Sequence, residues 1–532
     1  MTMQAEKFLR LGDEDVRDES EYHPIYKAEY DSSGAYVKKI TLLYYELIKL
    51  LKDLGFRRLD LAGNSFIIQL VDGVIKEMQQ QDVVDEYEDY LNSFGVEVFN
   101  DQVQKSMLLN KVYGSINTYF SKQVLSRLRS DDDLTIKQHT RDAGYFYYRN
   151  GFVEVKKDGY KFHEYSELEG VIWGNQILNR DFEEVPAKVY ENTNFAKFVK
   201  NIANYWEVRF YDKEKNPNPD HDRYLLFKAI IGNALHSYFD GKLKAVIFTD
   251  SRVSDDASGR TGKTLIMKAA GHMLNTNKQA TTYVELNGKD FDPNDRFKYQ
   301  QLAIDTRLVH INDVKAGFDF ETLFNDITEG IMCQKKNETP FLVPAKIYLT
   351  TNKIIHLPGD SAKDRSTEFE MADYYCAANG PDQEFDEWFF TDWDKEDWNA
   401  FDNFMISCLQ IYLQKGLQTA EGINLMERKL RAASCPEFIL FMEELKIKHL
   451  EEWKKRELFS RFLELNPDYS KFQWMRQRKF TTWLQKYAEY HPSVERIHER
   501  RSNNIDYFSF SLKGKGGVGD NKKSKDGDDL PF

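Results

Sequence analysis

The residues best suited to chemistry lie between Lys244 and Thr264, KAVIFTDSRVSDDASGRTGKT. An apolar, β-branched run leads into a polar loop that closes on Gly262-Lys263-Thr264, and helix-forming residues follow at once. In such a strand–loop–helix, backbone N–H groups at the start of the helix can hold the phosphates of a nucleoside triphosphate. Lys263 would reach the β- and γ-phosphates, and the Thr264 hydroxyl would bind Mg²⁺. The sequence thus predicts ATP and Mg²⁺ as cofactors, with phosphates held by Gly259, Arg260, Thr261, Gly262, Lys263 and Thr264.

This loop departs from the full pattern G-x-x-x-x-G-K-[ST], because Ala257 occupies the first glycine position. Gly259 can still supply flexibility nearby. A bare GKT also occurs by chance in ordinary surface loops, so the residues that follow it must decide between the two interpretations.

Two later apolar runs end in polar residues that suit the same site. RLVHINDV (307–314) predicts a buried strand that delivers Asn312 and Asp313 to its carboxyl end, where Mg²⁺ and the attacking water must be held. KIYLTTNK (346–353) predicts a second strand, ending in Asn352, whose amide can orient water or touch the γ-phosphate. The predicted metal ligands are Thr264, Asn312 and Asp313, and the predicted catalytic residues are Lys263, Asp313, Asn352 and Arg365.

Between and after these runs lie basic residues with expected roles of their own. GIMCQKKNETPFLVP (330–344) has apolar flanks around a basic centre and predicts a hairpin with Lys335 and Lys336 at its tip. Arg365 lies in a polar loop before an alternating strand. An arginine there can stabilise charge on a transferred phosphoryl group, usually across a subunit interface.

The region before the nucleotide loop alternates helical and strand patterns. Apolar spacing predicts a helix over 36–54, a β-meander over 55–78 and further strands over 145–165. A helix is expected over 192–215 and another over 224–238. The acidic run Asp131–Asp133 could suggest a metal site, but an exposed helix cap is the favoured interpretation.

Composition limits the class of protein. The 532 residues are 41% hydrophobic and include four well-separated cysteines, which indicates folded domains in a reducing compartment without a disulfide framework. The acidic start of the chain is not a signal peptide, and no apolar run reaches membrane-spanning length. We therefore expect a soluble, cytoplasmic protein with no membrane partner.

The net charge of −13 conceals a basic segment near the C-terminus. Residues 471–501 hold eight Lys or Arg against three Glu, a local excess of five. The pattern there predicts a helix followed by a strand, a basic tip at 500–504 and a second strand. This is the outline of a winged helix, with a helical lid as the alternative. The residues expected to bind DNA are Lys335, Lys336, Arg476, Arg478, Lys479, Arg500 and Arg501.

The last twenty residues form a Gly/Lys-rich linker that ends in DGDDLPF. An acidic cluster followed by Pro-Phe and a terminal carboxylate resembles the C-terminal tip of bacterial single-stranded-DNA-binding proteins. Proteins that bind that tip would be partners, through terminal-carboxylate capture. The alternative is a solubilising acidic tail. The predicted tip is Asp528, Asp529, Leu530, Pro531 and Phe532, with Asp526 beside it.

The ordered set GKT (262–264), HIND (310–313), KK (335–336), YLTTN (348–352) and DR (364–365) resembles superfamily 3 helicases of the AAA+ class. The likeness is to the phage and plasmid group similar to poxvirus-type primase–helicases, and it covers roughly 35–385. It implies an α/β AAA+ (P-loop NTPase) core in a homo-hexamer that moves along single-stranded DNA using ATP in phage or mobile-element replication. Duplex origin DNA would be a second nucleic-acid partner.

The resemblance also implies a division of the chain. We expect an α+β N-terminal domain, an ATPase core and a mostly helical C-terminal region ending in the winged helix. The expected segments are 1–185 (N-terminal domain), 186–222 (helical linker or collar), 223–385 (ATPase core), 386–512 (C-terminal region) and 513–532 (linker and tip).

One departure from this family leaves two alternatives open. Its second motif usually carries paired acids, whereas Asn312 brings no charge and leaves Asp313 as the sole acid. The protein could instead be a nucleotide-switched DNA-binding protein or loader with weak ATPase activity. It could also be an adaptor whose main task is to present the C-terminal tip.

Overall fold

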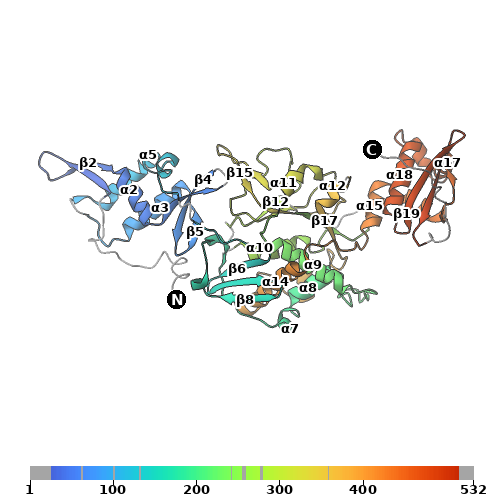
Figure 1. Cartoon of the computed structure of the whole chain (residues 1–532), viewed down its shortest axis with the longest axis horizontal. Coiled ribbons are helices and arrows are strands. Elements are labelled where there is room, and N and C mark those ends of the chain that lie inside the picture. Colours follow the sequence, from blue (N-terminus) through green and yellow to red (C-terminus); the bar gives the residue numbers. More distant parts are fainter. Residues whose placement is uncertain are drawn as a thin grey trace, which may run out of the picture. The chain divides into compact units, whose positions relative to one another are not determined.

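The computed structural model describes residues 25–61, 64–99, 102–130, 134–240, 243–253, 259–275, 280–357 and 359–514 (Figure 1). The predictions for Asp131–Asp133, Ala257 and the C-terminal tip fall outside these residues. The chain divides into two compact units, one formed by 1–249 with 258–420 and the other by 250–257 with 421–532.

The first part of the larger unit contains the predicted meander. Strands β3 (Phe56–Leu61), β4 (Asn64–Val71) and β5 (Val74–Glu77) pair antiparallel, and β9 (Ile172–Trp173) joins β5 in parallel. The helices beside them are α2 (Tyr44–Asp53), α3 (Gln80–Asn92), α4 (Lys105–Tyr113), α5 (Ile116–Tyr119) and α6 (Lys122–Leu125).

The helix expected over 36–54 is wrong in its first part. Strand β2 (Val37–Leu42) pairs there with β1 (Tyr26–Tyr30), and the helix α2 begins only at Tyr44. Ile40 and Leu42 are buried while the residues beside them are exposed, so the side chains alternate as a strand requires. Over so short a run, the apolar spacing fits both the repeat of a helix and the repeat of a strand. Pairing with β1 makes this segment a strand.

A second antiparallel sheet contains β6 (Ala143–Tyr148), β7 (Gly151–Lys156) and β8 (Gly159–His163), with β10 (Ile177–Leu178) parallel to β6. Around it lie α7 (Ala187–Tyr190), α8 (Asn194–Ile202), α9 (His221–Leu235) and α14 (Lys395–Lys415). The helix expected over 192–215 is too long: α8 stops at Ile202, and Asn204 takes a left-handed backbone conformation (φ 68°) that a helix cannot continue through.

The core of the larger unit is a five-stranded sheet in the order β12-β13-β16-β11-β17. The pairs β12–β13, β13–β16 and β16–β11 are parallel, and the apolar, β-branched residues of these strands are buried. β16 separates β11 from β13. The bounds are β11 (Ala245–Asp250), β12 (Tyr283–Asn287), β13 (Leu308–Asn312), β16 (Lys346–Thr350) and β17 (Ser366–Met371).

Short elements connect these strands. α10 (Lys263–Leu274) follows β11, and η5 (Phe320–Leu323) and α11 (Phe324–Thr328) follow β13. The predicted basic hairpin is confirmed: β14 (Ile331–Cys333) and β15 (Phe341–Val343) pair antiparallel. α12 (Gly359–Asp364) precedes β17, and α13 (Pro381–Phe385) follows it.

The smaller unit has its own hydrophobic core, which includes Phe438, Phe462 and Trp483. Its helices are α15 (Leu425–Ala433), α16 (Pro436–Glu444), α17 (Lys455–Leu465) and α18 (Gln477–Tyr490). Its sheet has the order β18-β20-β19, with β18 (Trp453–Lys454), β19 (Val494–Ser502) and β20 (Ile505–Leu512) antiparallel.

The basic tip expected over 500–504 lies differently. Arg500 and Arg501 belong to β19, and the left-handed residues Asn503 and Asn504 make the turn. Both arginines have acidic partners: Arg500 bonds Glu452 through two guanidinium nitrogens, and Arg501 lies 3.7 Å from Asp506.

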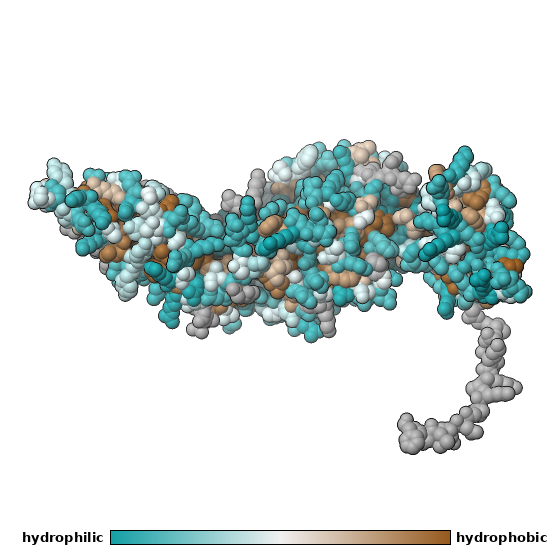
Figure 2. Space-filling model, turned by 90° about the horizontal axis from the view of Figure 1, so that it is seen from above, coloured by the Kyte–Doolittle hydropathy of each residue, from teal (hydrophilic) through white to brown (hydrophobic). Residues whose placement is uncertain are grey.

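The face of the molecule seen in Figure 2 is mostly hydrophilic, and hydrophobic residues appear on it in small separate groups. Within the described ranges, no helix is both long and apolar enough to cross a membrane.

Candidate nucleotide-binding site

The turn into α10 has the geometry that phosphate binding needs. Gly262 caps the helix in a left-handed conformation (φ 96°, ψ 0°). A Cβ atom at this position would come within 2.8 Å of the Phe198 ring of α8, so only glycine fits without displacement. The N–H groups of the first turn of α10 are therefore presented where an anion can accept from them.

Lys263 is the first residue of α10, and its ammonium group is already positioned. Its side chain is buried, and Nζ donates to Asn352 Oδ1 at 2.7 Å and to Thr261 Oγ1 at 3.2 Å. Asn352 lies just beyond the carboxyl end of β16, the strand next to β11. Two residues that the sequence assigned separately to one site thus make direct contact.

Asn312 lies at the carboxyl end of β13, the strand on the other side of β16, and contacts the residue that follows Lys263. Its Oδ1 accepts from Thr264 Oγ1 at 3.2 Å and from Thr350 Oγ1 at 2.7 Å. Because both contacts are hydroxyl donors, the amide oxygen faces Thr264. Hydroxyl and amide oxygens are ligands that Mg²⁺ accepts, so this pair fits the predicted metal.

Asp313, the predicted acidic partner, points to a different neighbour. Its backbone is left-handed (φ 59°), and its carboxylate Oδ2 lies 2.7 Å from Lys289 Nζ. That hydrogen bond raises the pKa of Lys289, which stays cationic. Asp313 lines the same cavity as Thr264, but its carboxylate forms an ion pair with Lys289.

Glu285 is a site residue that sequence reasoning missed. It lies in β12, and its Oε1 accepts from Asn312 Nδ2 at 2.7 Å. Its Oε2 is 3.3 Å from the hydroxyl of Tyr283, which in turn is 2.9 Å from Nδ1 of His310. Burial lowers the pKa of His310 to about 3, so this imidazole is neutral. YVELN carries no recognisable motif, and only the pairing of β12 with β13 reveals the contact.

A cavity of about 700 Å³ is lined by the nucleotide loop (259–265), Asn312, Asp313 and Asn352, but not by Glu285. Its far side is formed by residues after β17, which the sequence analysis did not assign. There Arg260 Nη1 donates to the carbonyl of Ala377 at 3.1 Å, and Trp388 is 67% exposed beside the cavity. A wall that combines aromatic and apolar side chains with a few polar groups suits a nucleoside. The wall consists of Cys376, Ala377, Gly380, Pro381, Asp382, Gln383, Glu387, Trp388 and Phe389.

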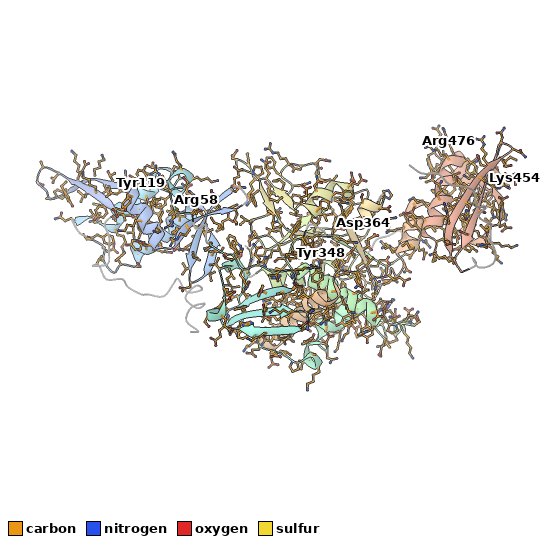
Figure 3. The ribbon with its side chains drawn as sticks, viewed as in Figure 1. Arg58, Tyr119, Tyr348, Asp364, Lys454 and Arg476 are labelled. Atoms are coloured by element: carbon orange, nitrogen blue, oxygen red, sulfur yellow. The ribbon has the colours of Figure 1, made fainter. Side chains whose placement is uncertain are left out.

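Arg365, the predicted trans-acting arginine, does not line this cavity. Its carbonyl accepts from the N–H of Ala245, the first residue of β11, so it lies at the end of the sheet away from the phosphate loop. Its guanidinium group lies over the Phe324 ring at 5.0 Å and bonds the carbonyl of Ser361. Figure 3 labels its neighbour Asp364, the last residue of α12.

The basic residues expected to bind DNA lie outside the cavity. Lys335 and Lys336 follow β14 in the hairpin loop, where Lys335 lies over the Phe341 ring at 5.7 Å. In the smaller unit, Arg476 (labelled in Figure 3) caps α18, and the exposed residues Arg478 and Lys479 lie in its first turn. Arg478 and Lys479 have no described carboxylate partner, unlike Arg500 and Arg501.

No protein-family model matches the sequence, and no curated protein matches it. Among solved structures, the apo structure of the NrS-1 C-terminal region is similar at a TM-score of 0.38 and 10% identity, covering 88% of this chain and 98% of that one. The JCV helicase bound to a thiazolopyridine compound is similar at a TM-score of 0.24 and 15% identity, covering 48% of this chain and 66% of that one. TM-scores and identities this low identify neither the fold nor the function of this chain.

Proposed function

We propose that the protein is an ATP-driven, ring-forming helicase that moves along single-stranded DNA. The observation that carries this proposal is the convergence of three strand ends on one cavity: Lys263 after β11, Asn312 at the end of β13 and Asn352 after β16. An ordinary surface loop would not bring a buried lysine to an amide on a neighbouring strand.

Each of these residues has a distinct task in hydrolysis. The N–H groups at the start of α10 hold the phosphates, and Lys263 moves from Asn352 to the γ-phosphate oxygens. Asn352, released from Lys263, can then orient the attacking water. Thr264 and Asn312 would hold Mg²⁺, which would supply charge neutralisation for the phosphates.

The DNA-binding part of the proposal rests on two basic elements. A hairpin that projects Lys335 and Lys336 can follow a DNA backbone. In the smaller unit the order helix, short strand, two helices and a β-hairpin supports a winged helix. In that fold α18 would enter a groove, and Arg476 at its N-cap, with Arg478 and Lys479 in its first turn, would contact the phosphates.

Steady-state ATP hydrolysis, with and without single-stranded DNA, tests the proposal. We expect DNA-stimulated turnover in the wild type and its loss in Lys263→Ala, because the variant lacks the phosphate-binding ammonium group. Arg431→Ala, which removes a surface cation paired with Glu427, is the matched control. Turnover that survives Lys263→Ala would contradict the proposal.

A second function, a nucleotide-switched DNA-binding protein, is favoured by one observation. Neither acid near Asn312 is free to bind Mg²⁺ directly in this structure. Asp313 pairs with Lys289, and Glu285 accepts a hydrogen bond from Asn312. Tight ATP binding with DNA binding but without turnover would favour this switch over the helicase.

A further inference from the structure

Asn312 is the residue that makes this site unusual, because it carries an amide where a carboxylate would neutralise a divalent cation. Its orientation is fixed by contacts at both ends of the amide. The oxygen accepts from Thr264 and Thr350, and the nitrogen donates to Glu285. Asn312 thus forms a bridge between the hydroxyl predicted to bind Mg²⁺ and a carboxylate on the next strand.

The pairing of β12 with β13 places Glu285 beside Asn312. β12 and β13 pair in parallel, with Glu285 opposite His310 and Asn287 opposite Asn312. Gly288 allows the close approach: its N–H donates to the carbonyl of Asn312 at 2.6 Å, and a Cβ there would come within 2.6 Å of that same oxygen. The carboxylate has described contacts only with Asn312, Tyr283 and His310, and no described lysine or arginine neutralises it.

We propose that Glu285 is a positioning residue for the metal site and supplies the negative charge that Asn312 lacks. This inference rests on the proposed nucleotide site. A carboxylate that accepts from the amide nitrogen increases electron density on the amide oxygen, which makes that oxygen a better ligand for a cation. The negative charge of Glu285 also attracts the cation electrostatically, because only the side chain of Asn312 would lie between the two.

The interaction can be tested by exchanging the two groups. Glu285→Gln keeps an oxygen that can accept from Asn312 and removes only the charge. The double variant Glu285→Gln/Asn312→Asp places the carboxylate on β13 and the amide on β12, and so keeps both the hydrogen bond and the net charge. Glu321→Gln, an exposed glutamate outside the cavity lining, is the charge-matched control.

The measurement is the affinity for a fluorescent ATP analogue as a function of Mg²⁺ concentration, with EDTA as the metal-free reference. Loss of an outer-sphere partner typically weakens metal affinity by about 10–100-fold. We therefore expect Glu285→Gln to raise the Mg²⁺ concentration at half-effect about 10-fold or more, with metal-free affinity unchanged. The double variant should recover most of this loss.

The outcomes separate this inference from the proposed function. A wild-type Mg²⁺ dependence in Glu285→Gln, alongside lost binding in Lys263→Ala, would overturn the role of Glu285 and leave the nucleotide site intact. Failure of the double variant to recover would also overturn it, because that variant keeps the hydrogen bond and the negative charge through which Glu285 is proposed to act. Wild-type protein that binds no nucleotide at any Mg²⁺ concentration would instead contradict the proposed function.

Discussion

At the scale of single residues, Lys346 shows how burial of a charge affects stability. Lys346 is the first residue of β16, and its buried Nζ donates to the carbonyl of Asn233 at 3.0 Å while lying 5.2 Å from the Tyr412 ring centroid. Tyr348, two residues on and labelled in Figure 3, bonds the same Asn233 through its side chain. Burial lowers the pKa of Lys346 from 10.5 to about 7.

This shift predicts a pH dependence of stability. Between about pH 7 and 10.5 the unfolded chain holds a proton on Lys346 that the folded chain does not, so the free energy of unfolding should rise with pH in that window. Lys346→Met keeps the buried length and removes the titrating group. Denaturant unfolding from pH 7 to 9 should show a smaller upward slope in this variant than in the wild type. Equal slopes would place the pKa of Lys346 near its ordinary value.

At the scale of elements, a buried ion pair holds three segments together. Arg180, just after β10, donates to both carboxylate oxygens of the fully buried Asp402 of α14, at 2.7 and 2.8 Å. The same guanidinium group bonds the carbonyl of His272 in α10 and lies 4.6 Å from the Trp398 ring centroid. The helix that follows the phosphate loop is thus tied to the antiparallel sheet and to α14.

Breaking this pair should be costly. Asp402→Ala leaves the arginine charge buried without compensation, and we expect a loss of about 3–5 kcal/mol in the free energy of unfolding. The double variant Arg180→Met/Asp402→Leu removes both charges and should recover most of that loss. Denaturant unfolding of the single and double variants measures both effects. A single variant within about 0.5 kcal/mol of the wild type would show that the pair is not compensating a buried charge.

Site residues could be predicted from the sequence where the pattern that marks them lies in the same short segment of the chain. Lys263, Thr264 and Asn352 follow apolar runs of the right length, and the sequence pattern placed each at a strand or helix end. Glu285 could not be found in that way, because its role exists only through the pairing of β12 with β13.

The same limit explains the errors in the elements. The apolar spacing of residues 37–42 fits either a helix or a strand, and pairing with β1 makes the segment a strand. Arg500 was predicted at a hairpin tip from its neighbours in sequence. Its bidentate partner Glu452 lies 48 residues away, where no local pattern points to it.

At the scale of the whole molecule, these pairings decide which basic residues remain available to DNA. Arg478 and Lys479 are exposed in the first turn of α18, whereas Arg500 is already neutralised by Glu452. We therefore expect Arg478→Ala and Lys479→Ala each to weaken DNA binding and to reduce the salt slope, log K against log salt, by about 0.9 for duplex DNA.

Arg500→Ala is the internal control for this measurement, since it removes a cation of the same kind that is paired within the protein. It should change the slope less than either α18 variant. Equal effects of all three substitutions, measured by fluorescence anisotropy over a salt series, would contradict the assignment of α18 as the DNA-contacting helix.

The position of Arg365 has a kinetic consequence. Because it lies at the end of the sheet opposite the phosphate loop, the cavity of its own chain is out of its reach. If this arginine stabilises transferred phosphate, two copies of the chain are needed for each catalytic event. The rate of hydrolysis per mole of protein would then fall on dilution, so the total rate would have an apparent order in protein above one. The rate per mole of protein would become constant only where every chain has a neighbour.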